Sequence, residues 1–289
     1  MKSIILSLFI LSLALIHSGF CFAQTSSSAS KQKKSRSNQT MQVDFETQNK
    51  VIFEPVTLSK DYRFQLPTQT KEVFVEVSRN VKLNGFLFDE PKSRELVIYF
   101  QGNSKNLQNF LDNHKMVLDW GFDVLVTDYR SFGKSEGKLE GQEQLYSDAE
   151  KIYDYALGLG YKPEQIILYG YSMGTAMVSH LATVKKAKAL ILESPYSSIP
   201  EISWVGDKTP AYELNNAVKA RKIKTPTLLI HGDKDDVITP DHSQRIYDAL
   251  AAKNKKRTVL EGGGHGDLRK RPEYKQLIID FVSSIGTTK

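Results

Sequence analysis

The chain of 289 residues is predicted to adopt an α/β fold, with a mainly parallel central sheet and helices on both faces. Two observations predict this fold. Short apolar runs alternate with segments whose apolar residues recur at helical spacing, and several runs are apolar at every position, as in strands buried on both faces. The composition, 40% hydrophobic and 25% charged, is ordinary for a globular protein and excludes a collagen, a coiled-coil rod or a wholly disordered chain.

The predicted elements alternate along most of the chain. Residues 194–221, rich in proline and small polar residues, interrupt the alternation and are expected to form a short lid. Ligands of a parallel sheet bind beyond the carboxyl ends of its strands, so the residues that follow each strand are the informative ones. The predicted strands are 73–77, 83–88, 96–100, 123–127, 165–169, 189–192, 227–230 and 257–260, and the predicted helices are 106–120, 142–159, 173–183, 242–252 and 274–285.

The N-terminus is predicted to be a signal peptide, residues 1–23. Lys2 precedes an apolar core of 13 residues, Ile4 to Ile16, and small Ala23 precedes the expected cleavage point. Such a core is too short to cross a ~30 Å hydrocarbon layer as a helix. Two alternatives remain open: Cys21 could carry a lipid, or residues 4–23 could stay uncleaved as a membrane anchor. Cleavage would leave an exported, periplasmic or secreted chain without cysteine, which suits an oxidising compartment.

Residues 24–50 are rich in serine and lysine and are predicted to form a flexible linker before a domain at 51–289. The formal net charge of the chain is +6, but residues 1–50 carry +4 of it, so residues 51–289 are nearly neutral at +2. A nucleic-acid partner is therefore not expected. At most, the basic N-terminal segment could associate weakly with a membrane or envelope surface, and no stable partner is evident. The single cysteine excludes a disulfide framework or a cysteine zinc cluster.

The strongest motif follows the predicted strand 165–169. Gly170-Tyr171-Ser172-Met173-Gly174 has the G-x-S-x-G pattern between a strand and a helix. The flanking glycines allow a sharp turn, and Ser172 is expected in strained backbone geometry that exposes its hydroxyl at a helix N-terminus. The alternative is an ordinary glycine-rich turn, which the context and the next two sites disfavour. Ser172 is thus a candidate nucleophile.

A carboxylate and an imidazole follow two later strands. Asp233, Asp235 and Asp236 come after 227–230, and each could orient an imidazole or belong to a solvated acidic loop. His265 lies in the glycine-rich loop after 257–260, the only histidine in such a loop. The order Ser, Asp, His is that of enzymes with this kind of nucleophile turn, and these enzymes place two backbone donors beside the nucleophile. The candidates here are the N–H groups of Met173 and of Asn103, in the loop after 96–100.

Over about residues 70–285 the sequence resembles the α/β-hydrolase superfamily, most of all small-lidded serine hydrolases with a Phe-His-Gly-Asn oxyanion strand. The motifs are Gly170–Gly174, Asp128–Gly137, Glu193–Tyr196 and Gly262–His265. The resemblance implies the α/β-hydrolase fold and Asp235 as the acid of the triad. Gln101 stands where the family has histidine, and we expect a reshaped oxyanion loop rather than an inactive enzyme.

These residues predict acyl transfer through a Ser172–His265–Asp235 triad, without metal or cofactor. A small-molecule carboxylic ester is the preferred substrate. A peptide or amide, a thioester, and a non-catalytic protein that kept the fold are the alternatives. Gln101, Phe132 and Tyr196 are expected to contact substrate because of their loop positions. The apolar lid residues could wall an acyl pocket or simply cover the sheet edge; they are Ile199, Ile202, Trp204, Val205 and Tyr212.

Overall fold

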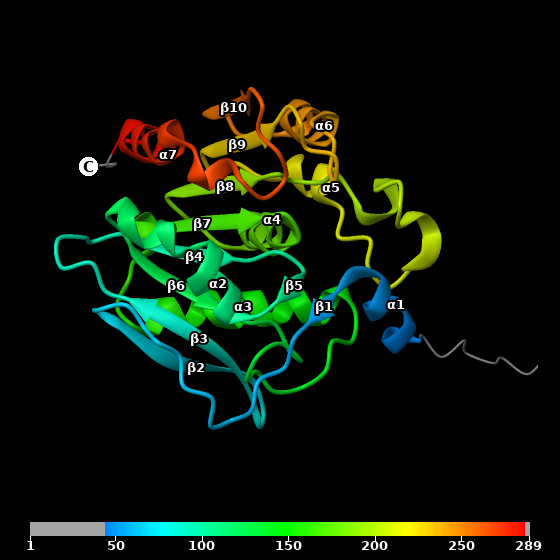
Figure 1. The fold of residues 1–289 in the computed structure, drawn as a ribbon. Helices are drawn as coiled ribbons and strands as arrows, with labels where there is room; N and C mark the ends of the chain where they lie inside the picture. The colour runs from blue at the N-terminus through cyan, green and yellow to red at the C-terminus, as the bar shows by residue number, and fades with distance from the viewer. Residues whose placement is uncertain (1–43, 287–289) are drawn as a thin grey trace, which may run out of the picture. The chain divides into compact units, whose positions relative to one another are not determined.

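The computed structural model describes residues 44–286 and contains an eight-stranded sheet (Figure 1). The predicted signal peptide and residues 24–43 of the predicted linker lie outside the described residues. The strand order is β10-β9-β8-β7-β4-β6-β3-β2. Pairing is antiparallel between β2 and β3 and between β3 and β6, and parallel elsewhere in this sheet. This confirms the predicted α/β architecture.

The described elements follow the predicted alternation closely. The strands are β1 (Glu54–Pro55), β2 (Thr70–Ser78), β3 (Val81–Phe88), β4 (Leu96–Phe100), β5 (Ser104–Lys105), β6 (Asp123–Thr127), β7 (Ile166–Tyr171), β8 (Ala189–Glu193), β9 (Thr227–Gly232) and β10 (Lys255–Leu260). The α-helices are α1 (Phe45–Ile52), α2 (Leu107–Asn113), α3 (Gln142–Gly158), α4 (Gly174–Val184), α5 (Asn216–Ala220), α6 (Asp241–Ala249) and α7 (Pro272–Ser284).

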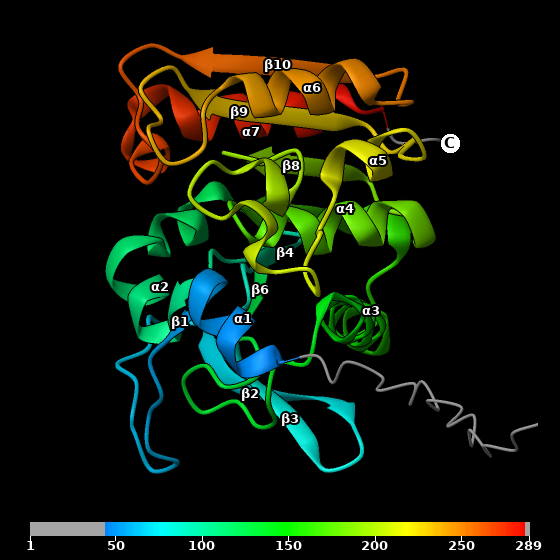
Figure 2. The same ribbon diagram turned by 90° about the vertical axis from the view of Figure 1, so that its right-hand side faces the viewer.

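The sheet is buried on both faces because its strands are apolar at every position. In β4, Leu96, Ile98 and Phe100 pack with α3 and α4 in one core cluster, whereas Val97 and Tyr99 pack with α2 and α7 in another. This division follows from the two-residue period of a strand, which sends successive side chains to opposite faces. Figure 2 shows the result at β9, with α6 in front of the sheet and α7 behind it.

One predicted helix divides in two. The segment 106–120 forms α2 and then a separate 3₁₀ helix, Lys115–Trp120. His114 separates them because its φ of −126° is outside the helical range, and its Nδ1 lies 2.9 Å from the buried Tyr99 hydroxyl. The sequence period is the same on both sides of His114, so periodicity alone predicted one continuous helix.

Helix α1 begins at Phe45, inside the segment 24–50 that was predicted to be a linker. We call residues 44–56 the strap. Its apolar residues Ile52 and Phe53 are buried in the core, and Phe53 meets the ring of Tyr212 edge-on at 5.6 Å. The side chains of Gln48 and Asn49 accept hydrogen bonds from the Ala211 N–H and the Tyr212 hydroxyl. The strap therefore packs against the segment between β8 and α5, as both figures show.

Within residues 44–286, no helix has both the length and the apolar character needed to cross a membrane.

Candidate active site

The turn between β7 and α4 holds Ser172 in the geometry that the motif predicts. Ser172 has φ +49°, in the left-handed region that a residue with a side chain rarely adopts. A Cβ on Gly174 would lie 2.0 Å from the backbone oxygen of Phe100, and one on Gly170 would lie 2.6 Å from the oxygen of Gly174. Glycine is therefore required at both positions because backbone atoms approach too closely for any side chain.

The three predicted triad residues come together at the carboxyl ends of β7, β9 and β10. His265 Nε2 lies 3.0 Å from Ser172 Oγ, and His265 Nδ1 lies 2.8 Å from Asp235 Oδ2. Both distances are within hydrogen-bond range. The three side chains thus form a continuous chain of hydrogen bonds from carboxylate to hydroxyl.

The carboxylate of Asp235 is held on both oxygens. Its Oδ1 accepts hydrogen bonds from the backbone N–H groups of Val237 (3.1 Å) and Ile238 (2.8 Å). Its Oδ2 also lies 3.2 Å from Nε2 of His231, a fully buried imidazole. Burial would raise the pKa of Asp235, but the hydrogen bonds from His231 and His265 outweigh it and hold that pKa well below its usual range. Asp235 therefore stays an anion beside His265.

Two backbone N–H groups are free beside the nucleophile. Within the described residues, neither the Asn103 nor the Met173 N–H donates to another protein atom. The strap holds Asn103 in place. The Asn103 side-chain Nδ2 donates to the backbone oxygen of Ile52 at 2.5 Å, and the backbone oxygen of Asn103 accepts from the Glu54 N–H at 2.9 Å. Next to this contact, the two-residue strands β1 and β5 pair in parallel. The geometry suits the predicted pair of oxyanion donors.

A cavity of about 170 Å³ opens beside Ser172, and we call it the lid cavity. Apolar side chains from the strap, the lid and the loop after β9 form most of its wall, and no Asp, Glu, Lys or Arg is among its described lining residues. Tyr196 lines it, and its hydroxyl donates to Met173 Sδ at 3.5 Å. The apolar residues of this wall are Ile52, Met173, Ile199, Ile202, Trp204, Val205, Val237 and Ile238. Tyr212 does not line the cavity because it packs under the strap.

The structure corrects one predicted substrate contact, Phe132, and places the side chain of another, Gln101, outside the lid cavity. Phe132 is fully buried, and its ring meets Phe53 at 6.2 Å and Tyr129 at 5.5 Å, so it belongs to the core beneath the strap. The Gln101 side chain does not line the lid cavity either; its Nε2 donates to Asp128 Oδ1 at 2.7 Å. Loop position alone could not show that these side chains turn inward.

Gln101 instead holds the loop that carries Asn103. Its amide bonds Asp128, and its backbone oxygen accepts from the Tyr129 hydroxyl at 2.7 Å. Glutamine thereby gives the loop a side-chain anchor at the position where the resembling family has histidine. Asp128 is fully buried, and desolvation raises its pKa to about 8 even though the hydrogen bond from Gln101 acts in the other direction.

Asp128 is expected to make stability fall as pH rises. Above its ordinary pKa of 3.8 the unfolded chain ionises this carboxyl, but the folded chain keeps it neutral until about pH 8. Stability from this group is therefore complete below pH 3.8 and is lost as pH rises through 8. We expect the stability of Asp128→Asn relative to wild type to increase by roughly 2–3 kcal/mol between pH 5 and 7. Urea unfolding of both proteins at each pH measures this, and an unchanged difference would contradict it.

The sequence analysis did not predict the role of two residues that support the site, Arg269 and His231. Arg269 ion-pairs with Glu193, with both side chains buried, and its guanidinium lies 4.1 Å from the Tyr171 ring centroid. His231 supports Asp235, and its only sequence signal is its position four residues earlier. Arg269 follows His265 by four residues, but a lone arginine in a polar loop is usually solvated.

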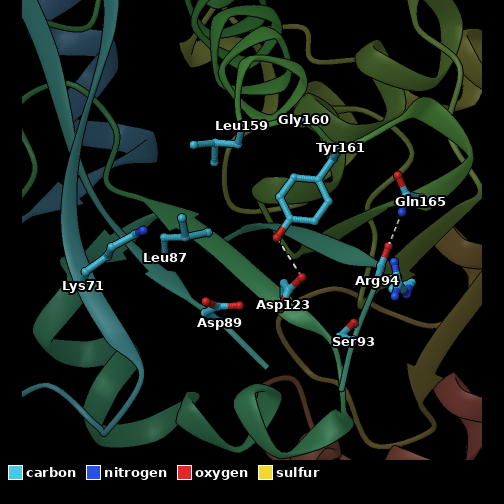
Figure 3. Close-up of a pocket in the computed structure, with 10 residues that line it drawn as sticks. All are labelled: Lys71, Leu87, Asp89, Ser93, Arg94, Asp123, Leu159, Gly160, Tyr161 and Gln165. Carbon is cyan, nitrogen blue, oxygen red and sulfur yellow. Dashed lines mark hydrogen bonds between the residues drawn. The ribbon is translucent and has the colours of Figure 1, made fainter. Parts of the chain in front are cut away.

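Not all of the cavity space is beside the triad, and one cavity lies well away from it. It measures about 360 Å³ and lies near the amino ends of β4, β6 and β7 (Figure 3). Its polar groups bond each other: the Tyr161 hydroxyl donates to Asp123 at 2.7 Å, and Gln165 Nε2 donates to Arg94 O at 2.6 Å (Figure 3). No candidate nucleophile or base of the sequence lies in it. Within residues 44–286, no cluster of three or more His, Cys, Asp or Glu side chains has metal-binding geometry.

The fold and this turn define the class of protein. The architecture of the sheet, the glycine-flanked Ser172 and the chain of bonds to His265 and Asp235 are those of an α/β hydrolase. Residues 91–214 and 215–270 match the model of a family described as "Serine aminopeptidase, S33", and the chain belongs to this family of the α/β-hydrolase superfamily.

Similar proteins agree with this assignment. The chain is 30% identical over 203 residues to α/β hydrolase domain-containing protein 17C of Xenopus tropicalis, covering 68% of this chain and 64% of the frog protein. It is 27% identical to a putative α/β hydrolase of Acanthamoeba polyphaga mimivirus, over 80% and 92% of the two chains. Among solved structures, a Pyrococcus furiosus esterase has the same fold, with TM-score 0.65 and 20% identity over 81% of this chain and 98% of that one.

Proposed function

We propose that this protein is a serine hydrolase that cleaves carboxylic esters through an acyl-enzyme intermediate. The observation that carries the proposal is the unbroken chain of bonds from Asp235 through His265 to Ser172, at 2.8 and 3.0 Å. The two free N–H groups of Met173 and Asn103 add the donors that a tetrahedral oxyanion needs.

In the proposed mechanism, Ser172 Oγ attacks the acyl carbonyl carbon while His265 Nε2 takes the hydroxyl proton. Asp235 accepts the His265 Nδ1–H, which fixes the tautomer and stabilises the imidazolium. The N–H groups of Met173 and Asn103 bind the oxyanion. His265 then gives its proton to the leaving group, and a water molecule, deprotonated by His265, releases the acid.

The lid cavity supports an ester with a short apolar acyl group. At about 170 Å³ it is smaller than the ~300–1,000 Å³ of pockets for drug-sized ligands, and its wall is apolar. An aminopeptidase needs a partner for the substrate ammonium, and none of the described lining residues is an Asp or Glu. An ester is therefore favoured over the peptide substrate that the family description would suggest.

Probe labelling and a substrate series test this function. We expect a fluorophosphonate probe to label the protein at Ser172, and Ser172→Ala to abolish labelling and hydrolysis. Acetyl and butyryl p-nitrophenyl esters should be hydrolysed with higher kcat/KM than palmitoyl ester or an aminoacyl anilide. Full activity in Ser172→Ala would contradict the mechanism, and a preference for the anilide would contradict the substrate class. Export with cleavage after Ala23 belongs to the proposal and rests on the N-terminal sequence; the intact mass of the exported protein checks it.

A further inference from the structure

A second cavity adjoins the catalytic turn, and we call it the polar cavity. It measures about 250 Å³ and shares Gly102, Ser104 and Tyr171 with the lid cavity. Its other lining residues are Gln101, Lys105, Asn109, Asn113, His114, Gly266 and Lys270. The wall thus contrasts with that of the lid cavity: it carries amides and two lysines where the other carries apolar side chains.

The electrostatic character of the polar cavity is positive. Lys105 and Lys270 are exposed, and within the described residues neither forms an ion pair. No described lining residue is acidic, and Asp267, three residues before Lys270, turns its carboxylate to the Gly264 N–H at 2.9 Å. The positive charges also affect the buried imidazole of His114. Burial is the largest cause that lowers its pKa to about 3, and the charges of Arg269, Lys270 and Lys105 lower it further.

The position of the polar cavity relates it to the leaving group of the proposed reaction. His265 must protonate the departing oxygen, so the alcohol portion of an ester extends along the wall beside His265. Gly266 forms part of that wall. Tyr171 stands between the two regions, with its ring centroid 5.4 Å from that of His265 and 5.5 Å from that of His114. Burial raises the pKa of Tyr171 to about 12, so its hydroxyl remains a neutral donor.

We propose that the polar cavity is a subsite for an anionic leaving group, a carboxylate or phosphate carried by the alcohol portion of the ester, held by Lys105 and Lys270. This inference rests on the proposed function and names its substrate class. The acyl group occupies the lid cavity and the charged alcohol occupies the polar cavity, on either side of the Gly102–Asn103 loop. The Asn113 amide donates to Asn109 Oδ1 at 2.8 Å, and the Asn109 Nδ2 supplies a neutral donor at the same wall.

Four butyrate esters test the subsite because they share an acyl group and differ in leaving-group charge. They are the esters of ethylene glycol (neutral), 2-hydroxyethyl phosphate, 4-hydroxybutanoate and choline (cationic). We expect kcat/KM for at least one anionic ester to exceed that of the neutral ester about 10-fold, with the cationic ester below the neutral one. The phosphate and carboxylate arms identify the anion. The preference should shrink in about 0.5 M NaCl because exposed charges are screened.

Two paired variants localise the effect. In Lys105→Gln/Lys270→Gln the anionic-to-neutral ratio of kcat/KM should fall to about 1. Lys222→Gln/Lys224→Gln removes the same charge from exposed lysines near the amino ends of the strands and should keep the ratio. Equal rates on anionic and neutral esters, or a preference that survives in the first variant, would overturn the subsite alone. If wild type hydrolysed none of the four esters, the proposed function would fall as well.

Discussion

Asp235→Asn is expected to lower kcat for ester hydrolysis by about 10⁴-fold with little change in the fold. The reason is the fixed orientation of this side chain. Its Oδ1 accepts two backbone N–H groups, from Val237 and Ile238, so an asparagine keeps its oxygen there and turns its NH₂ toward His265. His265 Nδ1 must then accept rather than donate. The proton moves to Nε2, which can no longer take the proton of Ser172.

Asp236→Asn is the matched control because it makes the same change one residue away. Asp236 is exposed, and no side-chain hydrogen bond to it is present within the described residues. Its variant should keep wild-type kcat. Steady-state kinetics on a butyryl ester, with circular dichroism to check folding, measures both variants. A loss of activity in Asp236→Asn, with activity retained in Asp235→Asn, would show that the neighbouring carboxylate is the acid of the triad.

Arg269→Met is expected to lower the free energy of unfolding by about 3–5 kcal/mol, because it leaves Glu193 charged and buried without its cation. The Glu193 and Arg269 side chains are 0% and 1% exposed. Glu193 also accepts from the Tyr169 hydroxyl, which lies 2.6 Å from that of Tyr274. Glu193 ends β8 and Arg269 lies in the loop of His265, so the ion pair joins that loop to the sheet.

The double variant Glu193→Gln/Arg269→Met separates loss of the ion pair from loss of a buried partner. With both charges removed, no uncompensated ion remains, so the double variant should be more stable than Arg269→Met by about 2 kcal/mol or more. Urea unfolding of the two single variants and the double variant completes the cycle. Additive effects, or a cost below about 1 kcal/mol for Arg269→Met, would show that the pair is not coupled as the structure indicates.

The sequence by itself determined the order of the main elements and identified Ser172, His265 and a group of three candidate carboxylates after the strands; the family resemblance selected Asp235 among the three. Continuous apolar runs predicted the buried strands, because a strand covered on both faces has no polar side to show. The glycines around Ser172 predicted its turn, because a side chain at either position would collide with nearby backbone atoms. The position of Asp235 and His265 after successive strands placed them at the same sheet edge, because parallel strands end together.

Only the tertiary structure decided which loop residues line the lid cavity and which pack beneath it. Phe132 lies in a loop like Tyr196, yet Phe132 turns into the core and Tyr196 lines the lid cavity. Residues 44–50 of the strap were predicted as polar linker, but they belong to a segment that forms α1, buries Ile52 and Phe53 and holds Asn103. Glu193 and Arg269 are 76 residues apart, and no local pattern pairs them. Periodicity and motifs report short-range constraints, whereas side-chain direction and buried ion pairs depend on contacts between distant segments.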